Sequence, residues 1–545
     1  MTGARLLFQL MRADFLERVR RHSFLVTLGF TLYAAYMFLP PNHSNYATLD
    51  LDGHRGVYNS AWVGTLVAML SVTFLSMAGF YLVKNAVERD RRTGVGAILA
   101  TTPISGPVYL LGKLLSNFAV LATMVALLAV AAGVMQVILG EDTHVRLVPL
   151  LTPFVLVTLP TMGVVAALAV LFEVIPILRG GLGNIAYFFL WITSLSLSAA
   201  KGHGPSEVVS ISILVHQMQA ACTAVYPDYG GGGNYSMGFN IKSGSWDAKT
   251  FVWEGARWTP EMLAWRAFWM AVPLALTLGA ALFFDRFDTQ GVTIGSGKRQ
   301  PARSLRARAP QPADEAQDPA PAFSGSASQM SGGRVLTRLT ERVGHSRFGA
   351  LVLAELRITL KGVSRWWVFA SLAIVAASLF VPLAGARQFL APMAMIWPIL
   401  RWSPMGTREI RHRTDALLFS SPRPVARLLA AQWLTGWIVA LAVGSGAVVR
   451  FALHADWGTV AALTAGTVFV PSMALAFGTW SGSAKLFEVI YLLLWYGGPM
   501  NRIPAIDFVG TTQPAAGPGA PIAFLVLAAG LMSLAVLGRR RQLRR

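Results

Sequence analysis

The chain has 545 residues, of which 54% are hydrophobic and only 13% are charged, and its net charge is +20. Soluble domains usually carry about a quarter charged residues, so this composition excludes a soluble enzyme. Apolar runs of about 20 residues recur along the whole chain, and runs of that length cross a bilayer as helices. We therefore expect an all-α, polytopic helical membrane protein with about twelve transmembrane helices.

The basic residues are distributed unevenly among the segments between these runs. If both termini are cytoplasmic, most of the 46 basic residues fall in cytoplasmic segments, as the positive-inside rule requires. The excess is expected to contact anionic lipids, and no basic stripe on a soluble domain points to nucleic acid. In chain order, the predicted spans are 23–39, 61–83, 114–139, 148–172, 181–200, 264–284, 366–384, 388–401, 429–449, 458–479, 484–498 and 520–538.

A polar segment at 286–345 divides the chain. It is rich in Pro, Ala, Ser and Arg and cannot bury enough apolar surface to fold alone. It predicts a disordered, basic cytoplasmic linker between two six-span halves, residues 1–285 and 346–545. The first half also contains a large outside loop at 201–262, for which the sequence suggests no role.

The two halves share three features in the same order, which indicates an internal repeat. Each opens with a basic amphipathic stretch that can lie flat in the membrane interface, at Leu6–Arg21 and Ala350–Arg365. Each has a similar cytoplasmic loop between its second and third spans, at 84–113 and 401–428. The pentapeptide Leu-Phe-Glu-Val-Ile occurs twice, around Glu173 and Glu488. Two-repeat membrane proteins are typically transporters.

The two cytoplasmic loops are the most informative stretches. Glu88 and Arg92 are spaced to pair on one helical face, and the Thr-Thr-Pro sequence ending at Pro103 can end one helix and begin another. Two short helices joined by a bend form a suitable docking surface for a soluble partner; the alternative is an ordinary solvated loop with positive-inside arginines. The residues expected to couple to such a partner are Glu88, Arg92, Thr93, Pro103, Glu409, Arg413, Thr414 and Pro422.

These loops, with the amphipathic entry stretches, resemble those of the permease subunits of type-2 ATP-binding-cassette (ABC) exporters. The resemblance implies that each loop is a coupling helix that docks on a cytoplasmic ABC ATPase, present in two copies, in a bacterial inner membrane. The second loop departs from the pattern, because Ala431-Gln432 replaces Gly112-Lys113. The chain lacks the Gly-x4-Gly-Lys-Ser/Thr phosphate-binding loop, so ATP and Mg²⁺ would bind the partner. No cofactor is expected on this chain.

Two acidic residues lie near predicted span ends. Glu173 and Glu488 are close in sequence to Arg179 and Lys485, respectively. One interpretation is that they pair with these cations and couple span movement to the loops, since ionisable groups at membrane depth are costly and often functional. The other is that they anchor span ends by reaching water.

Two other functions remain as alternatives. Asp50 and Asp52 follow the first span, where a membrane glycosyltransferase would place acidic residues, and an Asp-x-Asp pair can hold a divalent cation. A secondary transporter without an ATPase would need charged or broken helices near mid-membrane, and few charges lie there. No metal site is expected, because the histidines have no metal-site spacing and Cys222 is the one cysteine. The transported substrate cannot be identified from the sequence.

Overall fold

The structure is a computed structural model that is predominantly helical. It describes residues 3–20, 22–41, 46–199, 207–229, 235–241, 248–284, 348–412, 414, 418–419, 425–513 and 517–543. Nine helices within these ranges are long and apolar enough to cross a membrane, or ten if one bent pair counts as a span. The all-α polytopic fold is therefore confirmed.

The expected number of twelve spans is not reached within the described residues. The predicted spans 23–39 and 484–498 correspond to helices of 17 and 12 residues, shorter than the 20 or so residues that a straight span needs. The predicted linker at 286–345 lies outside the described residues. The described residues form two compact units that divide between Asp288 and Thr289, except that Glu488–Leu493 group with the first unit.

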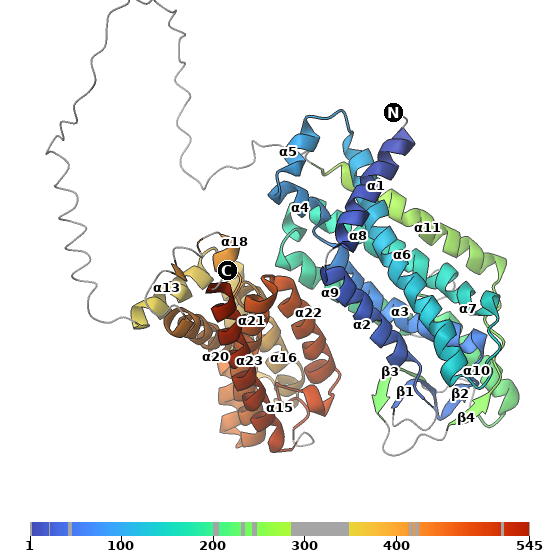
Figure 1. Ribbon diagram of the computed structural model, residues 1–545. Helices are drawn as coiled ribbons and strands as arrows, with labels where there is room; N and C mark the ends of the chain where they lie inside the picture. Colours follow the sequence, from blue (N-terminus) through green and yellow to red (C-terminus); the bar gives the residue numbers. More distant parts are fainter. Residues whose placement is uncertain are drawn as a thin grey trace, which may run out of the picture. The chain divides into compact units, whose positions relative to one another are not determined.

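The first unit has long helices beside one small sheet. Figure 1 shows α4 and α5 at one end of this unit and the strands at the other. Its elements are α1 (Gly3–Val19), α2 (His22–Phe38), β1 (Tyr46–Leu51), β2 (His54–Gly56), α3 (Ser60–Val83), α4 (Ala86–Arg92), α5 (Val95–Ala100), α6 (Gly106–Leu139), α7 (Leu147–Pro153), η1 (Phe154–Thr158), α8 (Leu159–Val174), η2 (Pro176–Leu178), α9 (Gly181–Ala199), α10 (Ile211–Val225), β3 (Tyr235–Ile241), β4 (Lys249–Phe251) and α11 (Pro260–Ala281).

The second unit is helical throughout its described residues. Its first two helices are bent by 107° relative to each other at a short break. Its elements are α13 (Phe348–Leu360), α14 (Arg365–Phe380), α15 (Leu383–Gly385), η5 (Ala386–Leu390), α16 (Ala391–Ile396), α17 (Ile399–Trp402), α18 (Arg408–Arg411), η6 (Val425–Leu429), α20 (Ala430–Leu453), α21 (Trp457–Ser481), α22 (Ala484–Trp495), η7 (Tyr496–Met500), η8 (Pro504–Ile506) and α23 (Gly519–Leu543).

Local signals fix where the long helices begin and how closely they pack. Asn59 caps α3 by accepting a hydrogen bond from the Trp62 N–H, and Thr259 caps α11 in the same way. Gly64 of α3 allows a close backbone approach, because a Cβ there would lie 2.4 Å from the Leu150 carbonyl oxygen. Small residues at such contacts are the usual means of packing membrane helices.

The sheet of the first unit has the strand order β3-β1-β2-β4. Strands β1 and β2 form an antiparallel hairpin in which Leu51 pairs with His54, so the turn is Asp52-Gly53. Both turn residues have positive φ, 50° and 78°, which is the conformation that an Asp-Gly hairpin turn adopts. The long loop at 201–262 contributes β3, β4 and α10. It is therefore partly ordered against the segment that follows α2.

Candidate functional site

The segment from α4 to α5 is a pair of short helices, as expected, but the bend lies at Thr93-Gly94 and not at the Thr-Thr-Pro sequence. Gly94 has φ 78°, a value that glycine tolerates best. Pro103 follows α5 and is exposed, as is Thr93. Along α5, Val95 and Ile98 are 43% and 67% exposed, whereas Leu99 packs on the core of the unit. The helix thus presents apolar side chains outward.

The N-terminus of α4 is held by the carboxylate of Glu173, which reaches it from the last turn of α8. Four consecutive backbone N–H groups, those of residues 85–88, donate to the two carboxylate oxygens at 2.5 to 3.0 Å. The first N–H groups of a helix have no partner within it and carry a partial positive charge, so a buried carboxylate there satisfies both needs. Glu173 thus joins the end of α8 to the start of α4.

Arg179 caps the end of the helix that carries Glu173. Its guanidinium donates to the carbonyl oxygens of Glu173 at 2.9 Å and Val174 at 2.7 Å, which caps the C-terminus of α8. The Glu173 carboxylate thus accepts from backbone N–H groups, and the Arg179 guanidinium donates to two backbone carbonyls. Glu173 is 2% exposed, so its carboxylate lies in the interior of the unit.

The second pentapeptide occupies a different kind of position. Glu488 lies in the first half of α22, whereas Glu173 lies at the end of α8, so the two glutamates are not on corresponding elements. Glu488 is buried and accepts a hydrogen bond from the side-chain amide of Asn184. Lys485 lies in the first turn of α22, and its backbone N–H donates to the Ser483 hydroxyl at 3.3 Å.

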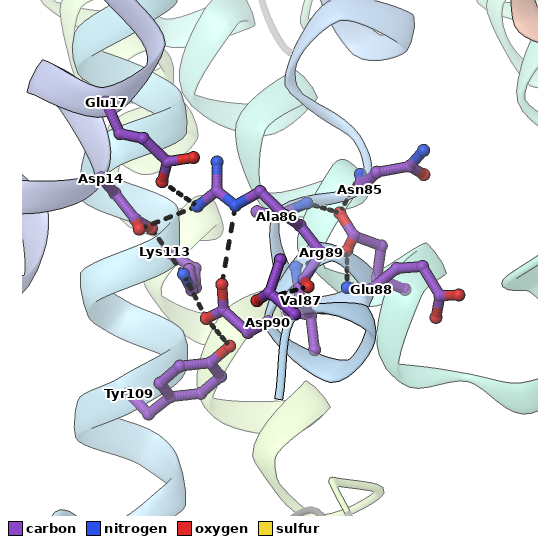
Figure 2. Close-up of polar contacts among 12 residues, drawn as sticks. Asp14, Glu17, Asn85, Ala86, Val87, Glu88, Arg89, Asp90, Tyr109 and Lys113 are labelled. Atoms are coloured by element: carbon purple, nitrogen blue, oxygen red, sulfur yellow. Dashed lines mark hydrogen bonds and ion pairs between the residues drawn. The ribbon is translucent and has the colours of Figure 1, made fainter. Parts of the chain in front are cut away.

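A network of charged side chains joins α4 to α1 and α6. Asp14 of α1 contacts Lys113 at 2.6 Å and Arg89 at 2.9 Å, and Asp90 contacts Lys113 at 2.6 Å. The Tyr109 hydroxyl donates to Asp90 at 2.8 Å. Figure 2 shows these side chains converging from three helices. The network fixes α4 against two of the long helices, while Glu173 fixes it against a third.

Sequence reasoning missed most of this network. It singled out the entry stretch for its arginines, although Asp14 is the residue of that stretch that reaches α4 and α6. Figure 2 shows the carboxylate of Glu88 pointing away from the network. The side chain of Arg92 lies outside the described residues, so the expected Glu88–Arg92 pair stays a prediction.

In the second unit, the corresponding glutamate is enclosed. Glu409 is 3% exposed and accepts hydrogen bonds from the Gln432 side chain and from Arg539 of α23, the latter at 3.3 Å. Arg539 is 1% exposed and also donates to Gln432 at 3.2 Å. Thr414 is exposed, and its N–H donates to the Glu409 carbonyl at 3.0 Å. Arg413 and Pro422 lie outside the described residues.

The acidic pair considered for an enzyme lies in the hairpin of the first unit. The Asp50 carboxylate accepts the Gly53 N–H at 2.8 Å and so stabilises the turn, and Asp52 is a turn residue with φ 50°. The described part of the chain contains no group of three or more metal-binding side chains. Cys222 is buried in α10.

The site therefore consists of an exposed, partly apolar helix, α5, next to a helix that is tied to α1, α6 and α8 by buried charges. Such an arrangement can transmit a displacement from the surface to long helices. A comparison of the sequence with protein-family models and with curated proteins finds no match.

Proposed function

We propose that the chain is the transmembrane permease subunit of an ATP-driven ABC exporter in a bacterial cytoplasmic membrane, with both termini cytoplasmic. A separate ATPase docks on the α4–α5 segment of the first half and on the loop at 401–428 of the second. The single observation that carries the proposal is the combination of an outward apolar face on α5 with the buried attachment of α4. The resemblance of the loop motifs to those of type-2 ABC permeases supports the same function.

The attachment of α4 explains how docking does work on the membrane helices. A rigid-body push on α5 also displaces the adjoining helix α4. Because Glu173 and Asp14 hold α4 to α8 and α1, these two helices move with it. Charge-assisted hydrogen bonds contribute about 1.5–3 kcal/mol each, so α4 follows these helices instead of sliding over them. ATP-driven closure of two ATPase subunits would thus shift the two halves between inward-open and outward-open states.

The partner ATPase supplies ATP, Mg²⁺ and the hydrolysis step, so this chain is a transport subunit and not an enzyme. The low charge of the predicted spans favours a hydrophobic or amphipathic cargo. Export, as opposed to import, is proposed from the family resemblance.

The two alternatives receive less support. A glycosyltransferase would need Asp50 and Asp52 free to bind a metal and substrate, whereas Asp50 stabilises a hairpin turn. A secondary transporter leaves the outward apolar face of α5 without a purpose. Neither alternative accounts for the anchored α4–α5 segment.

The proposal is tested by purification of the tagged full-length protein from its native membranes in mild detergent, followed by identification of bound proteins. We expect a near-stoichiometric ATPase with a phosphate-binding loop, and ATP hydrolysis by the purified complex. Ile98→Glu should release it, because burying a charge in an apolar contact costs more than the 1.4 kcal/mol that weakens binding tenfold.

Val252→Glu is the matched control, because Val252 is 61% exposed and follows β4 at the opposite end of the same unit. Retention of the ATPase by this variant and its loss from Ile98→Glu would support the proposal. Equal retention by both variants, or purification without any ATPase, would contradict it.

A further inference from the structure

The second unit contains a small basic pocket between the end of α13 and the segment from α17 to α18. Its volume is about 170 Å³, and its lining includes Ile358, Thr359, Arg401, Arg408, Arg411 and His412. Pockets for drug-sized ligands usually measure about 300–1,000 Å³, so this one fits a single small anionic group.

The three arginines carry more positive charge than their surroundings neutralise. Arg408 pairs with Glu355 at 3.4 Å and donates to the Thr359 hydroxyl at 3.3 Å. The Nε atom of Arg401 is buried, and the described residues offer it no hydrogen-bond acceptor. No ion pair of Arg411 occurs within the described ranges. Guanidinium groups in such a setting match the oxygens of a phosphate.

The position of α13 places this pocket at the level of lipid headgroups. Because α13 is bent by 107° from the apolar helix α14, it runs close to the membrane plane when α14 spans the bilayer. It exposes Leu353 and Ile358, and Trp366 at the start of α14 is also exposed. An amphipathic helix with exposed apolar residues and a nearby tryptophan is typical of the membrane interface.

The first unit has carboxylates at the corresponding positions. The offset that aligns Glu88 with Glu409 aligns Asp90 with Arg411, and the offset that aligns Arg12 with Arg357 aligns Asp14 with Thr359. In the first unit, Asp14 and Asp90 neutralise the cations between α1, α4 and α6. The second unit has arginine and threonine instead, and it leaves a space where an outside anion fits.

We propose that this pocket binds a phosphate group, and that the headgroup of an anionic phospholipid supplies it. Arg401, Arg408 and Arg411 contact the phosphate oxygens, and the exposed Ile358 lies along the acyl chains. Basic pockets beside membrane helices bind anionic lipid headgroups by this combination of charge and apolar surface. The pocket lies in the loop at 401–428 on which we propose that the ATPase docks, but phosphate binding there does not require the ATPase.

The test measures binding to the purified full-length protein in neutral detergent. The probes are short-chain phosphatidylglycerol, short-chain phosphatidylcholine and inorganic phosphate, each read out by native mass spectrometry and by thermal stabilisation. We expect phosphatidylglycerol to bind, and Arg411→Gln to weaken it about tenfold, since a hydrogen bond to a charged group is worth about 1.5–3 kcal/mol. Arg411 is exposed, so this change should not disturb folding.

Two further variants sharpen the test. Thr359→Asp should abolish binding, because it supplies the carboxylate that the first unit already has. Arg357→Gln is the control. Arg357 is exposed on α13 and does not line the pocket, so this substitution removes the same charge outside the site. Stabilisation by inorganic phosphate as strong as by phosphatidylglycerol would support the phosphate site but assign it to a soluble ligand. Equal binding of phosphatidylcholine, or equal loss in Arg357→Gln and Arg411→Gln, would overturn the proposal.

Discussion

The α4 region of the first unit and the α18 region of the second contain similar sequence motifs but bury different acids. In the first, Glu88 is half-buried and the enclosed carboxylates are those of Asp90 in α4 and Glu173 in α8. In the second, the aligned Glu409 is itself enclosed. Two loops that are similar in sequence thus place their side chains in different contacts.

The side chains around these acids also differ between the two units. Lys113 of α6 pairs with two carboxylates in the first unit, whereas its sequence counterpart Gln432 joins Glu409 to Arg539 in the second. In the first unit a cation thus lies between two acids, whereas in the second a neutral amide lies between an acid and an arginine. The sequence departure at Ala431-Gln432 is therefore matched by a change of network.

The largest effect is expected at Glu173. Glu173→Ala leaves four backbone N–H groups of the first turn of α4 without their acceptor. Since an unsatisfied buried polar group costs about 1–3 kcal/mol and α4 can partly relax, we expect a loss of about 3–5 kcal/mol in the free energy of unfolding. Thermal unfolding in detergent measures it, and amide exchange should rise in α4 first. Unchanged exchange in α4 would show that Glu173 does not hold it.

Lys113→Gln makes the first network resemble the second in one residue and should not be tolerated. It leaves Asp14 and Asp90 without the cation that lies between them, and breaking a buried pair costs about 3–5 kcal/mol, of which Arg89 offsets part. We expect a loss of about 3 kcal/mol in thermal or denaturant unfolding. Arg12→Gln is the control, because Arg12 is exposed on α1 and should cost less than about 0.5 kcal/mol.

The two aligned glutamates should differ when each is changed to glutamine. Glu409→Gln weakens the partner of the buried Arg539 and should cost about 2 kcal/mol. Glu88→Gln should cost less than Glu409→Gln, because Glu88 is half-buried whereas Glu409 is enclosed. Similar losses of stability in both variants, measured under identical detergent conditions, would remove the distinction between the two regions.

The smallest expected effect is a loss of stability at acid pH, and one carboxyl group in each unit should contribute to it. Burial alone would raise the pKa of Glu141, but hydrogen bonds from Arg55 and the Tyr58 N–H outweigh it and lower the pKa below its ordinary 4.5. Burial alone would also raise the pKa of Asp456, but hydrogen bonds from Thr459 and Arg387 lower it.

A carboxyl pKa lower in the folded state gives stability that is present above the unfolded pKa and lost as pH falls through the folded value. The thermal unfolding temperature should therefore decline as the pH is lowered below about 4.5. Glu141→Gln and Asp456→Asn should each make that decline slightly less steep than in the wild type. A decline as steep in both variants as in the wild type would mean that these two acids do not contribute.

Local sequence signals predicted the membrane helices well, because the length of an apolar run is a property of the run itself. They failed where a contact involves backbone groups or distant side chains. The four groups that donate to Glu173 are backbone N–H groups, which the sequence does not distinguish from those of other residues. A nearby cation was therefore the partner to expect. The pairing of Asp14 with Lys113 depends on how α1 packs on α6.

The hairpin could have been predicted. The sequence Asp50-Leu51-Asp52-Gly53 contains an Asp-Gly turn signal, and the metal interpretation of its two acids hid that signal. The burial of Glu409 could not have been foreseen, because it depends on Arg539, 130 residues further along the chain. Aligning two motifs indicated that the loops are related but not which of their acids is enclosed.

The most direct test of ATPase docking uses a single reactive cysteine on α5. Cys222 is buried, so Ile98→Cys introduces one accessible thiol, to which a photoactivatable crosslinker can be attached in native membranes. Val252→Cys is the control at the opposite end of the unit. We predict a crosslinked product that contains an ATPase with a phosphate-binding loop from Ile98→Cys and none from Val252→Cys. Products with lipid alone, or the same products from both positions, would contradict the proposed function.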